Sequence, residues 1–144
     1  MSREIKFRAW DKDEKRMLEV YRIGFDGPID GAQVYCYLDD RGAKGSKECF
    51  YDGDGLTLEQ FTGLKDRNGQ EIYEGDILAW HSNIYRKQDW IGLVKYRGAG
   101  FVVQESSRSF STPDWLETAC NKDANIIEVV GNIHENPELL EANK

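Results

Sequence analysis

The chain has 144 residues, enough for one domain that buries roughly 70% of its unfolded surface and needs no disulfide or metal ion to hold a core. Its formal charge of -7 disfavours extended binding to a nucleic-acid backbone, because that binding draws its affinity from clustered Lys and Arg. No apolar window reaches the length of a membrane span or of a signal peptide core, so we expect a soluble, cytoplasmic protein.

The cysteines also favour a reducing compartment. Cys36, Cys49 and Cys120 are odd in number and lack close-paired spacing, so we expect no disulfide framework. Cys36 lies inside an apolar alternation, where we expect it to pack as a small hydrophobic side chain.

Strand patterns dominate the first third of the chain. Apolar and polar residues alternate in IKFRAW (5–10) and again in MLEVYRI (17–23), which predicts a β-hairpin. AQVYCYL predicts a third strand at 33–38, with its two tyrosines on the face opposite the apolar residues. The segment 39–56 is rich in Gly and Asp with little periodicity, and we expect a loop or a ragged edge there.

Short strands continue in the second half of the chain. Runs rich in β-branched and aromatic residues predict antiparallel strands; they are ILAW, WIGLVKY, FVVQ and NIIEVVGNI. Two short helices are predicted, one opened by Ser111-Thr112-Pro113-Asp114 before WLETAC and one opened by Asn136-Pro137-Glu138. Many short strands with few helices favour a small barrel or roll.

The stretch TGLKDRNGQEIYEGDIL (62–78) has two interpretations. The carboxylates of Glu74-Gly75-Asp76 suggest a chemical site, but they have no acid-base partner and no set of cation ligands nearby in sequence. Asn68-Gly69 is a strong signal for a tight turn, and Gly75 permits a second sharp bend. We therefore predict a turn that returns with Ile72 facing inward.

No pattern in the chain predicts a metal site, a cofactor or a catalytic group. YDGDGLTLEQF (51–61) resembles a calcium loop, but two essential oxygen ligands are missing, which favours a solvated turn. His81 and His134 lack the close spacing of zinc ligands, and neither has an evident catalytic partner. We expect no cofactor and no enzyme activity.

The remaining candidates for a binding site are aromatic and basic residues between two predicted strands. Aromatic rings beside basic groups can stack bases or hold proline-rich peptides; the candidate residues are Trp80, His81, Tyr85, Arg86, Lys87 and Trp90. In the alternative interpretation, Trp80 and Trp90 end core strands, and only Tyr85-Arg86-Lys87 faces solvent.

Three segments, IKFRAWDKDEKRML, QFTGLKDRNGQEIYEGDIL and VVGNIHENPELL, closely resemble the YopX family of phage and prophage proteins. The resemblance implies one YopX-like domain over 1–144 with a mainly β fold. In it, an N-terminal β portion (about 1–58) that includes the hairpin precedes an SH3-like barrel (about 60–133) and a short C-terminal helix (about 137–142). It also implies a phage or prophage origin and the cytoplasm of a bacterial host. It supplies no reaction and no ligand.

We therefore expect a non-enzymatic, phage-derived binding or assembly module that acts through protein contacts or self-association. The alternative is a nucleic-acid-associated regulator that uses the barrel face, and an enzyme comes third. NIIEVVGNI has only Glu128 as a charged side chain and would be sticky at a sheet edge, so we predict that it lies in the sheet interior. We expect any self-association to use another surface, such as AQVYCYL.

Overall fold

The computed structural model describes residues 4–27, 30–80, 90–106, 109–122 and 127–143. The chain divides into two compact units, residues 2–60 and residues 61–144, which meet within one strand. Each unit is built around an antiparallel sheet, so the predicted mainly β architecture is confirmed. None of the helices in the described ranges is long and apolar enough to cross a membrane.

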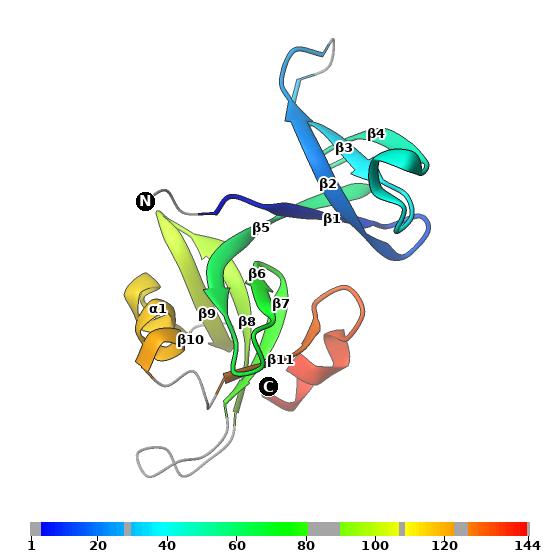
Figure 1. The fold of residues 1–144 in the computed structure, drawn as a ribbon. Coiled ribbons are helices and arrows are strands. Elements are labelled where there is room, and N and C mark those ends of the chain that lie inside the picture. The colour runs from blue at the N-terminus through cyan, green and yellow to red at the C-terminus, as the bar shows by residue number, and fades with distance from the viewer. Residues whose placement is uncertain (1–3, 28–29, 81–89, 107–108, 123–126, 144) are drawn as a thin grey trace. The chain divides into compact units, whose positions relative to one another are not determined.

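The N-terminal unit contributes five strands to a six-stranded antiparallel sheet in the order β4-β3-β2-β1-β5-β6, in which β6 (Glu71–Tyr73) pairs with the later part of β5 (Figure 1). Its elements are β1 (Phe7–Asp11), β2 (Arg16–Gly24), β3 (Gln33–Tyr37), the 3-10 helix η1 (Gly42–Lys44), β4 (Lys47–Tyr51) and the first part of β5 (Leu56–Lys65). One face of the sheet carries an apolar core; it consists of Ala9, Leu18, Val34, Cys36 and Leu56. Cys36 is fully buried in this core, as its place in the alternation predicted.

The predicted N-terminal hairpin is confirmed by the pairing of β1 with β2, in which Arg8 lies opposite Glu19. The Asp11 carboxylate stabilises its turn, because it accepts hydrogen bonds from the backbone N–H groups of Asp13 (3.1 Å) and Glu14 (3.3 Å). The same carboxylate pairs with Arg16 at 3.1 Å. A short acidic side chain that satisfies turn N–H groups is a common device for closing a hairpin.

Strand β4 lies in the segment for which the sequence left a loop or a ragged edge open. It pairs with β3 from Gln33–Tyr51 to Tyr37–Lys47 and is the terminal strand of the sheet. Residues Ser46 to Cys49 are all exposed. The missing alternation therefore reflects an edge strand with little to bury rather than an absence of structure.

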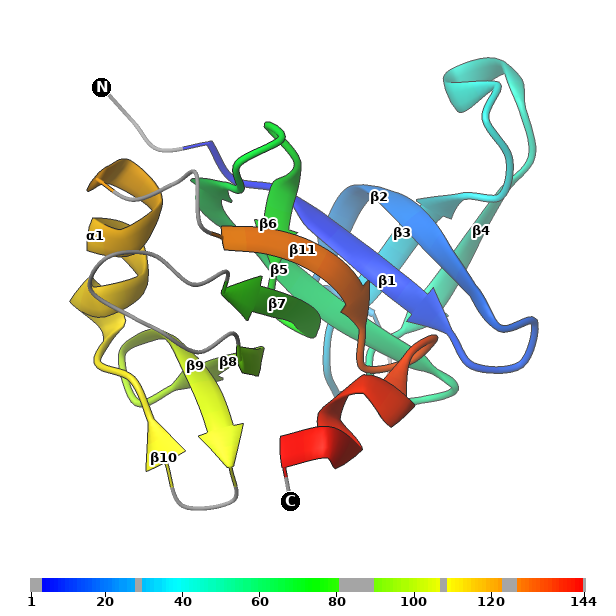
Figure 2. The same cartoon turned by 90° about the horizontal axis from the view of Figure 1, so that it is seen from below.

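The C-terminal unit contains the other sheet, which is antiparallel and five-stranded in the order β10-β9-β8-β7-β11 (Figure 2). Its elements are β6 (Glu71–Tyr73), β7 (Asp76–Trp80), β8 (Trp90–Arg97), β9 (Gly100–Ser106), β10 (Ser109–Phe110), α1 (Pro113–Lys122), β11 (Ile127–Asn132) and the 3-10 helix η3 (Pro137–Asn143). The strand pairings among the described residues form open sheets, and they do not close the SH3-like barrel that the resemblance implied.

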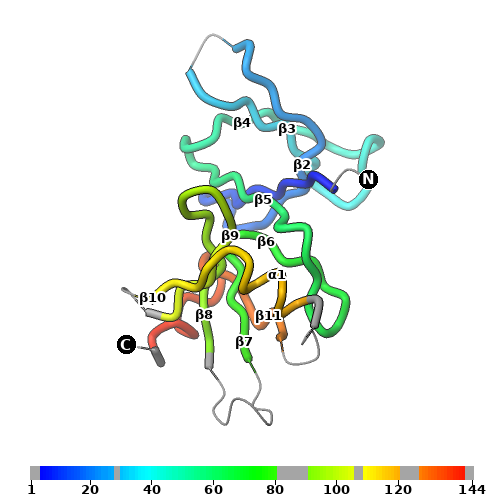
Figure 3. Tube along the Cα trace, turned by 90° about the vertical axis from the view of Figure 1, so that its left-hand side faces the viewer, coloured from blue at the N-terminus to red at the C-terminus, as the bar shows by residue number. Residues whose placement is uncertain are grey.

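A single apolar cluster joins the sheet of the C-terminal unit to α1. Pro113 occupies the first turn of this helix, as predicted, and the path from β9 through β10 into the helix can be followed in Figure 3. Leu116, Ala119 and Cys120 of the helix pack against the sheet. Ile72 from β6 belongs to the same cluster and is fully buried, which confirms its predicted inward orientation.

The stretch 62–78 forms a turn, as the glycine pattern predicted. Gly69 has a φ of +79° and donates its N–H to the carbonyl oxygen of Asp66 at 3.0 Å. Asp66 also donates its own N–H to the Gln70 carbonyl oxygen at 2.9 Å. A side chain at position 69 would meet no atom within 4 Å, so the requirement for glycine there comes from the backbone conformation.

The prediction that NIIEVVGNI lies inside the sheet is wrong, since β11 is a terminal strand that pairs with β7 alone in its sheet. The turn around Asp66 covers its outer edge. Arg67 donates its N–H to the Ile127 carbonyl oxygen at 2.9 Å, and the Asp66 carboxylate accepts the N–H of Val129 at 2.8 Å. An edge can thus be protected by a turn from elsewhere in the chain, which a local pattern does not reveal.

Candidate functional site

The binding residues predicted from the sequence fall mostly outside the described part of the chain. His81, Tyr85, Arg86 and Lys87 lie outside the described residues, as does the side chain of Trp90. The backbone of Trp90 opens β8 opposite Trp80 of β7.

Trp80 lies in the core, as the alternative interpretation of this segment predicted. Its side chain is 1% exposed, and its ring centroid is 5.0 Å from that of Trp115 in α1. The aromatic pair therefore fixes the helix to the sheet, and the Trp80 ring offers no surface to a ligand.

The buried carboxylates of the molecule serve its own backbone and arginines. Asp66 is 5% exposed, and its carboxylate accepts the N–H groups of Asn68 (2.8 Å), Gln70 (2.9 Å) and Val129 (2.8 Å). The Asp76 carboxylate accepts the Tyr73 N–H at 2.8 Å, so the conspicuous Glu74-Gly75-Asp76 run contributes a turn contact.

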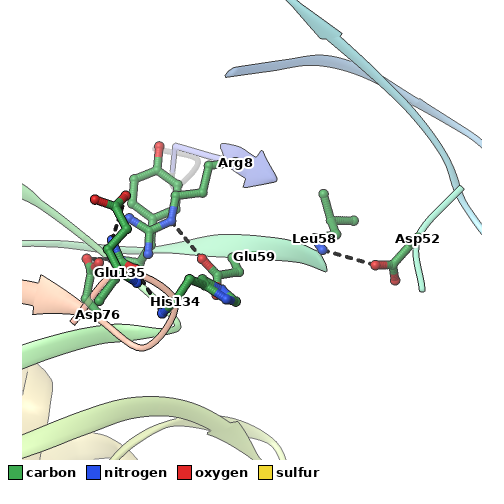
Figure 4. Close-up of polar contacts among 9 residues, drawn as sticks. Arg8, Asp52, Leu58, Glu59, Asp76, His134 and Glu135 are labelled. Carbon is green, nitrogen blue, oxygen red and sulfur yellow. Dashed lines mark hydrogen bonds and ion pairs between the residues drawn. The ribbon is translucent and has the colours of Figure 1, made fainter. Parts of the chain in front are cut away.

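The buried Glu59 carboxylate pairs with an arginine in the N-terminal unit. Figure 4 shows the Arg8 side chain directed at Glu59, with 2.9 Å between the Arg8 Nε and the Glu59 Oε1. The same view shows the Asp52 carboxylate accepting the N–H of Leu58 at 3.0 Å, a contact between the turn and β5. Within the ranges that the structure describes, no group of three or more His, Cys, Asp or Glu side chains is arranged to hold a metal ion.

Three tyrosines gather on the sheet face opposite the apolar core of the N-terminal unit. We call this surface, formed by Tyr21, Tyr35 and Tyr37 with Arg22 and Lys47, the tyrosine face. The rings of Tyr21 and Tyr37 stack with centroids 4.5 Å apart, and the Tyr35 ring lies 6.1 Å from Tyr21. Tyr21 is 40% exposed, and the other two tyrosines are half-buried.

Alternation and a β-bulge together build the tyrosine face. Alternation places Tyr35 and Tyr37 on one face of β3, and Tyr21 shares that face because it lies two residues after Glu19, which is opposite Tyr37. The register of β2 against β3 shifts between Val20 and Arg22, so Arg22 lies opposite Tyr35 and joins the same face. The alternation in AQVYCYL was visible in the sequence, but the bulge that adds Arg22 was not.

Two cations extend the tyrosine face. The Arg22 guanidinium lies 5.0 Å from the centroid of the Tyr35 ring, and the Lys47 ammonium lies 5.7 Å from that of Tyr21. Each such contact at an exposed site contributes about 0.5 to 1 kcal/mol. The cations contact the ring faces, and the tyrosine hydroxyls lie beside the apolar surface of the rings.

The hydroxyl of Tyr35 remains protonated at neutral pH. Desolvation raises its pKa above the ordinary value near 10, and the neighbouring Cys49 raises it further, while Arg22 acts in the opposite direction. A neutral hydroxyl both donates and accepts hydrogen bonds, so the face combines ring surface, two cations and a neutral polar group. Exposed tyrosine and arginine side chains are enriched at protein interfaces relative to the rest of the surface.

Comparison with known proteins agrees with the resemblance seen in the sequence. The family model described as YopX protein matches residues 6–141. The chain is similar to the crystal structure of protein EF1440 from Enterococcus faecalis, with 33% identity, a TM-score of 0.60, and coverage of 96% of this chain and 99% of that chain. The protein yopX from Bacillus subtilis shares the fold at 22% identity and a TM-score of 0.56, over 94% of this chain and 95% of that chain. None of the curated proteins matches.

Proposed function

The chain belongs to the YopX protein family, and on this premise we propose that it is a phage- or prophage-derived binding or assembly module that acts without catalysis, through protein contacts. The observation that carries the proposal is the tyrosine face, where three adjacent rings and two cations lie on one side of the N-terminal sheet. Tyrosine and arginine are enriched at protein interfaces and in their energetic hot spots.

The geometry of the face favours recognition of a protein. The stacked Tyr21–Tyr37 pair is ordered before binding, so a partner would cost the rings little conformational entropy. Tyr21 keeps 40% of its surface open, which leaves ring area to bury in a complex. A partner that fits presents apolar side chains to the rings and carboxylates to Arg22 and Lys47.

Charge disfavours the alternative function as a nucleic-acid-associated regulator. The two cations of the face are accompanied by Glu19 opposite Tyr37 and by Glu48 next to Lys47. A chain of formal charge -7 gains little from counterion release when so few cations contact phosphates. Stacking of bases on Tyr21 and Tyr37 remains the specific chemistry that this alternative would use.

The experiment compares wild-type protein with the variants Tyr21→Ser and Tyr37→Lys, each immobilised and exposed to extract from infected host cells. Tyr96→Ser is the matched control, because Tyr96 is 55% exposed on the other unit. A protein retained by the wild type and by the control is then purified, and its affinity for all four forms is measured by calorimetry.

We expect the purified partner to bind the wild type and the control alike and to lose at least about tenfold in affinity for each variant of the face, as for a hot-spot residue. Equal affinity for all four forms would reject the tyrosine face as the binding surface. Retention on DNA or RNA that falls steeply with salt and depends on Tyr21 and Tyr37 would instead support the nucleic-acid function.

A further inference from the structure

Strand β4 presents its backbone to the outside of the N-terminal sheet. Hydrogen bonds from Leu38 N–H to the Ser46 carbonyl oxygen (2.9 Å) and from Asp52 N–H to the Ala32 carbonyl oxygen (3.0 Å) frame its pairing with β3. In an antiparallel ladder the bonded residues alternate, so Glu48 and Phe50 bond toward β3. The N–H and C=O groups of Lys47 and Cys49 consequently point away from the sheet.

The outer side of β4 carries no further strand in the described ranges, where the sheet order ends at β4. No described segment covers its side chains either, since Lys47, Glu48 and Cys49 are all exposed. A row of outward N–H and C=O groups on an exposed strand is a template for pairing with another strand.

The side chains of β4 are compatible with an antiparallel copy of the same strand. Lys47 opens the strand and Asp52 follows its last residue, while Lys44 ends η1 and Asp54 lies in a turn in which its N–H bonds the Tyr51 carbonyl oxygen. An antiparallel copy centred on Cys49 places Lys47 of each chain opposite Tyr51 of the other, and Glu48 opposite Phe50.

The neighbouring registers are less favourable. A pairing centred on Glu48 places this residue opposite its own copy, and a pairing centred on Phe50 places Glu48 opposite Asp52, so each of these registers brings like charges together. The register centred on Cys49 places no like charges opposite each other along the strand. A second copy of this chain therefore has one alignment that avoids like-charge contacts.

We propose that the outer edge of β4 pairs antiparallel with β4 of a second copy, centred on Cys49, so that two N-terminal sheets form one continuous sheet. Residues directly opposite in such a pair share a face. The tyrosine faces of the two copies thus lie on the same side and form one extended surface. This pairing uses the backbone edge and does not depend on the partner proposed for the tyrosine face.

The test is sedimentation velocity in reducing buffer across a concentration series, with the wild type expected to form a dimer. Cys49→Pro removes an outward N–H without removing a bond to β3, and Cys49→Ser retains that N–H. We expect the proline variant to be monomeric and the serine variant to dimerise like the wild type, while the circular dichroism of both stays unchanged.

A change of charge provides a second test that leaves the backbone intact. Tyr51→Lys places a like charge opposite Lys47 twice in the dimer and should weaken it at least about fivefold, and the double variant Lys47→Glu with Tyr51→Lys should restore it. Lys95→Glu changes an exposed lysine of β8 by the same charge as Lys47→Glu and should have no effect.

The results for these variants distinguish dimerisation through the β4 edge from dimerisation through the tyrosine face. A monomer at every concentration overturns the proposal, and so does a dimer that Cys49→Pro and Tyr51→Lys leave unchanged. A dimer lost in Tyr37→Lys but retained in Cys49→Pro also overturns it, since self-association would then use the tyrosine face. Dimerisation with the expected pattern of variants supports it whether or not a protein partner binds the tyrosine face.

Discussion

Strands β4 and β11 are both terminal strands of antiparallel sheets, and they differ in what lies along their outer edges. The edge of β11 is covered by the turn at Asp66 and Arg67, which bonds the backbone of Val129 and Ile127. The described residues provide no such cover for β4. The apolar strand, which would aggregate if left open, is protected, whereas the charged strand is left accessible.

The two units also differ in whether their conspicuous side chains make internal contacts or stay exposed. In the C-terminal unit the acidic turn, the buried Trp80–Trp115 pair and the edge of β11 all serve internal stability. In the N-terminal unit the tyrosine face and the β4 edge leave ring surface and backbone groups exposed on the neighbouring strands β2, β3 and β4. The proposed binding role therefore belongs to residues 2–60.

Proline substitution at the two edges should show the largest difference. Val129→Pro removes the N–H that Asp66 accepts, and we expect it to lower the free energy of unfolding by about 3 kcal/mol or more. Cys49→Pro removes an outward N–H and should cost less than about 1 kcal/mol. Urea denaturation of both variants measures the difference, and equal losses would mean that the β4 edge is bonded after all.

Removal of the Asp66 carboxylate, which covers the outer edge of β11, should have the next largest effect on stability. Asp66→Ala leaves three backbone N–H groups without their acceptor in a buried place, so we expect a loss of about 3 kcal/mol in unfolding free energy together with aggregation through β11. Asp52→Ala is the control, because this exposed carboxylate accepts one N–H and should cost less than about 1 kcal/mol. A soluble Asp66→Ala variant of wild-type stability would refute the covering role.

A smaller effect is expected from the turn backbone. Gly69→Val places a β-branched residue at a φ of +79°, which should cost about 1 to 2 kcal/mol. Gly69→Asn is the matched control, since asparagine tolerates this conformation better, and its melting temperature should stay closer to that of the wild type. Equal melting temperatures for glycine and valine would show that the turn relaxes.

The two buried thiols should react more slowly than the exposed one. Burial raises the pKa of both Cys36 and Cys120 to about 11, so their thiols stay protonated at pH 8, whereas Cys49 is exposed. We expect iodoacetamide at pH 8 to modify Cys49 alone, as judged by mass spectrometry of the peptides. Rapid modification of Cys36 or Cys120 in the folded protein would contradict the described cores.

The same shifts predict a pH dependence of stability. A folded pKa above the ordinary value near 9 means that the folded state holds the thiol proton more tightly, so the stabilising contribution is complete below pH 9. It is lost as the pH rises from about 9 through about 11. Urea denaturation at pH 8 and pH 10 should therefore show a lower free energy of unfolding at pH 10, and this drop should be smaller in Cys36→Ala.

Local patterns predicted the features that depend on neighbouring residues. Alternation located β1, β2 and β3, and the glycine pair identified the turn at Gly69 because only its own backbone is involved. Strand β4 was harder to predict, since an exposed edge has no buried face and hence no clear alternation. The position of β11 depended on Asp66, more than 60 residues away, which no local pattern contains.

The candidate site was predictable only in part. The two tyrosines of AQVYCYL were evident from their spacing, and the sequence already suggested that segment as a contact surface. Arg22 joins them through a bulge, and Lys47 joins them from a strand with no sequence signature. Trp80 was ambiguous because tryptophans at strand ends occur both in hydrophobic cores and in ligand sites, and the sequence alone does not show how the ring packs.

Amide hydrogen exchange across a dilution series tests the contrast between the two edges most directly. The account predicts that the Val129 amide is protected at every concentration, because Asp66 of the same chain accepts its hydrogen bond. The Cys49 amide should be protected only at concentrations at which β4 pairs with a second copy, and should exchange rapidly on dilution. Protection of Cys49 that persists at the lowest concentration, or rapid exchange of Val129, would contradict it.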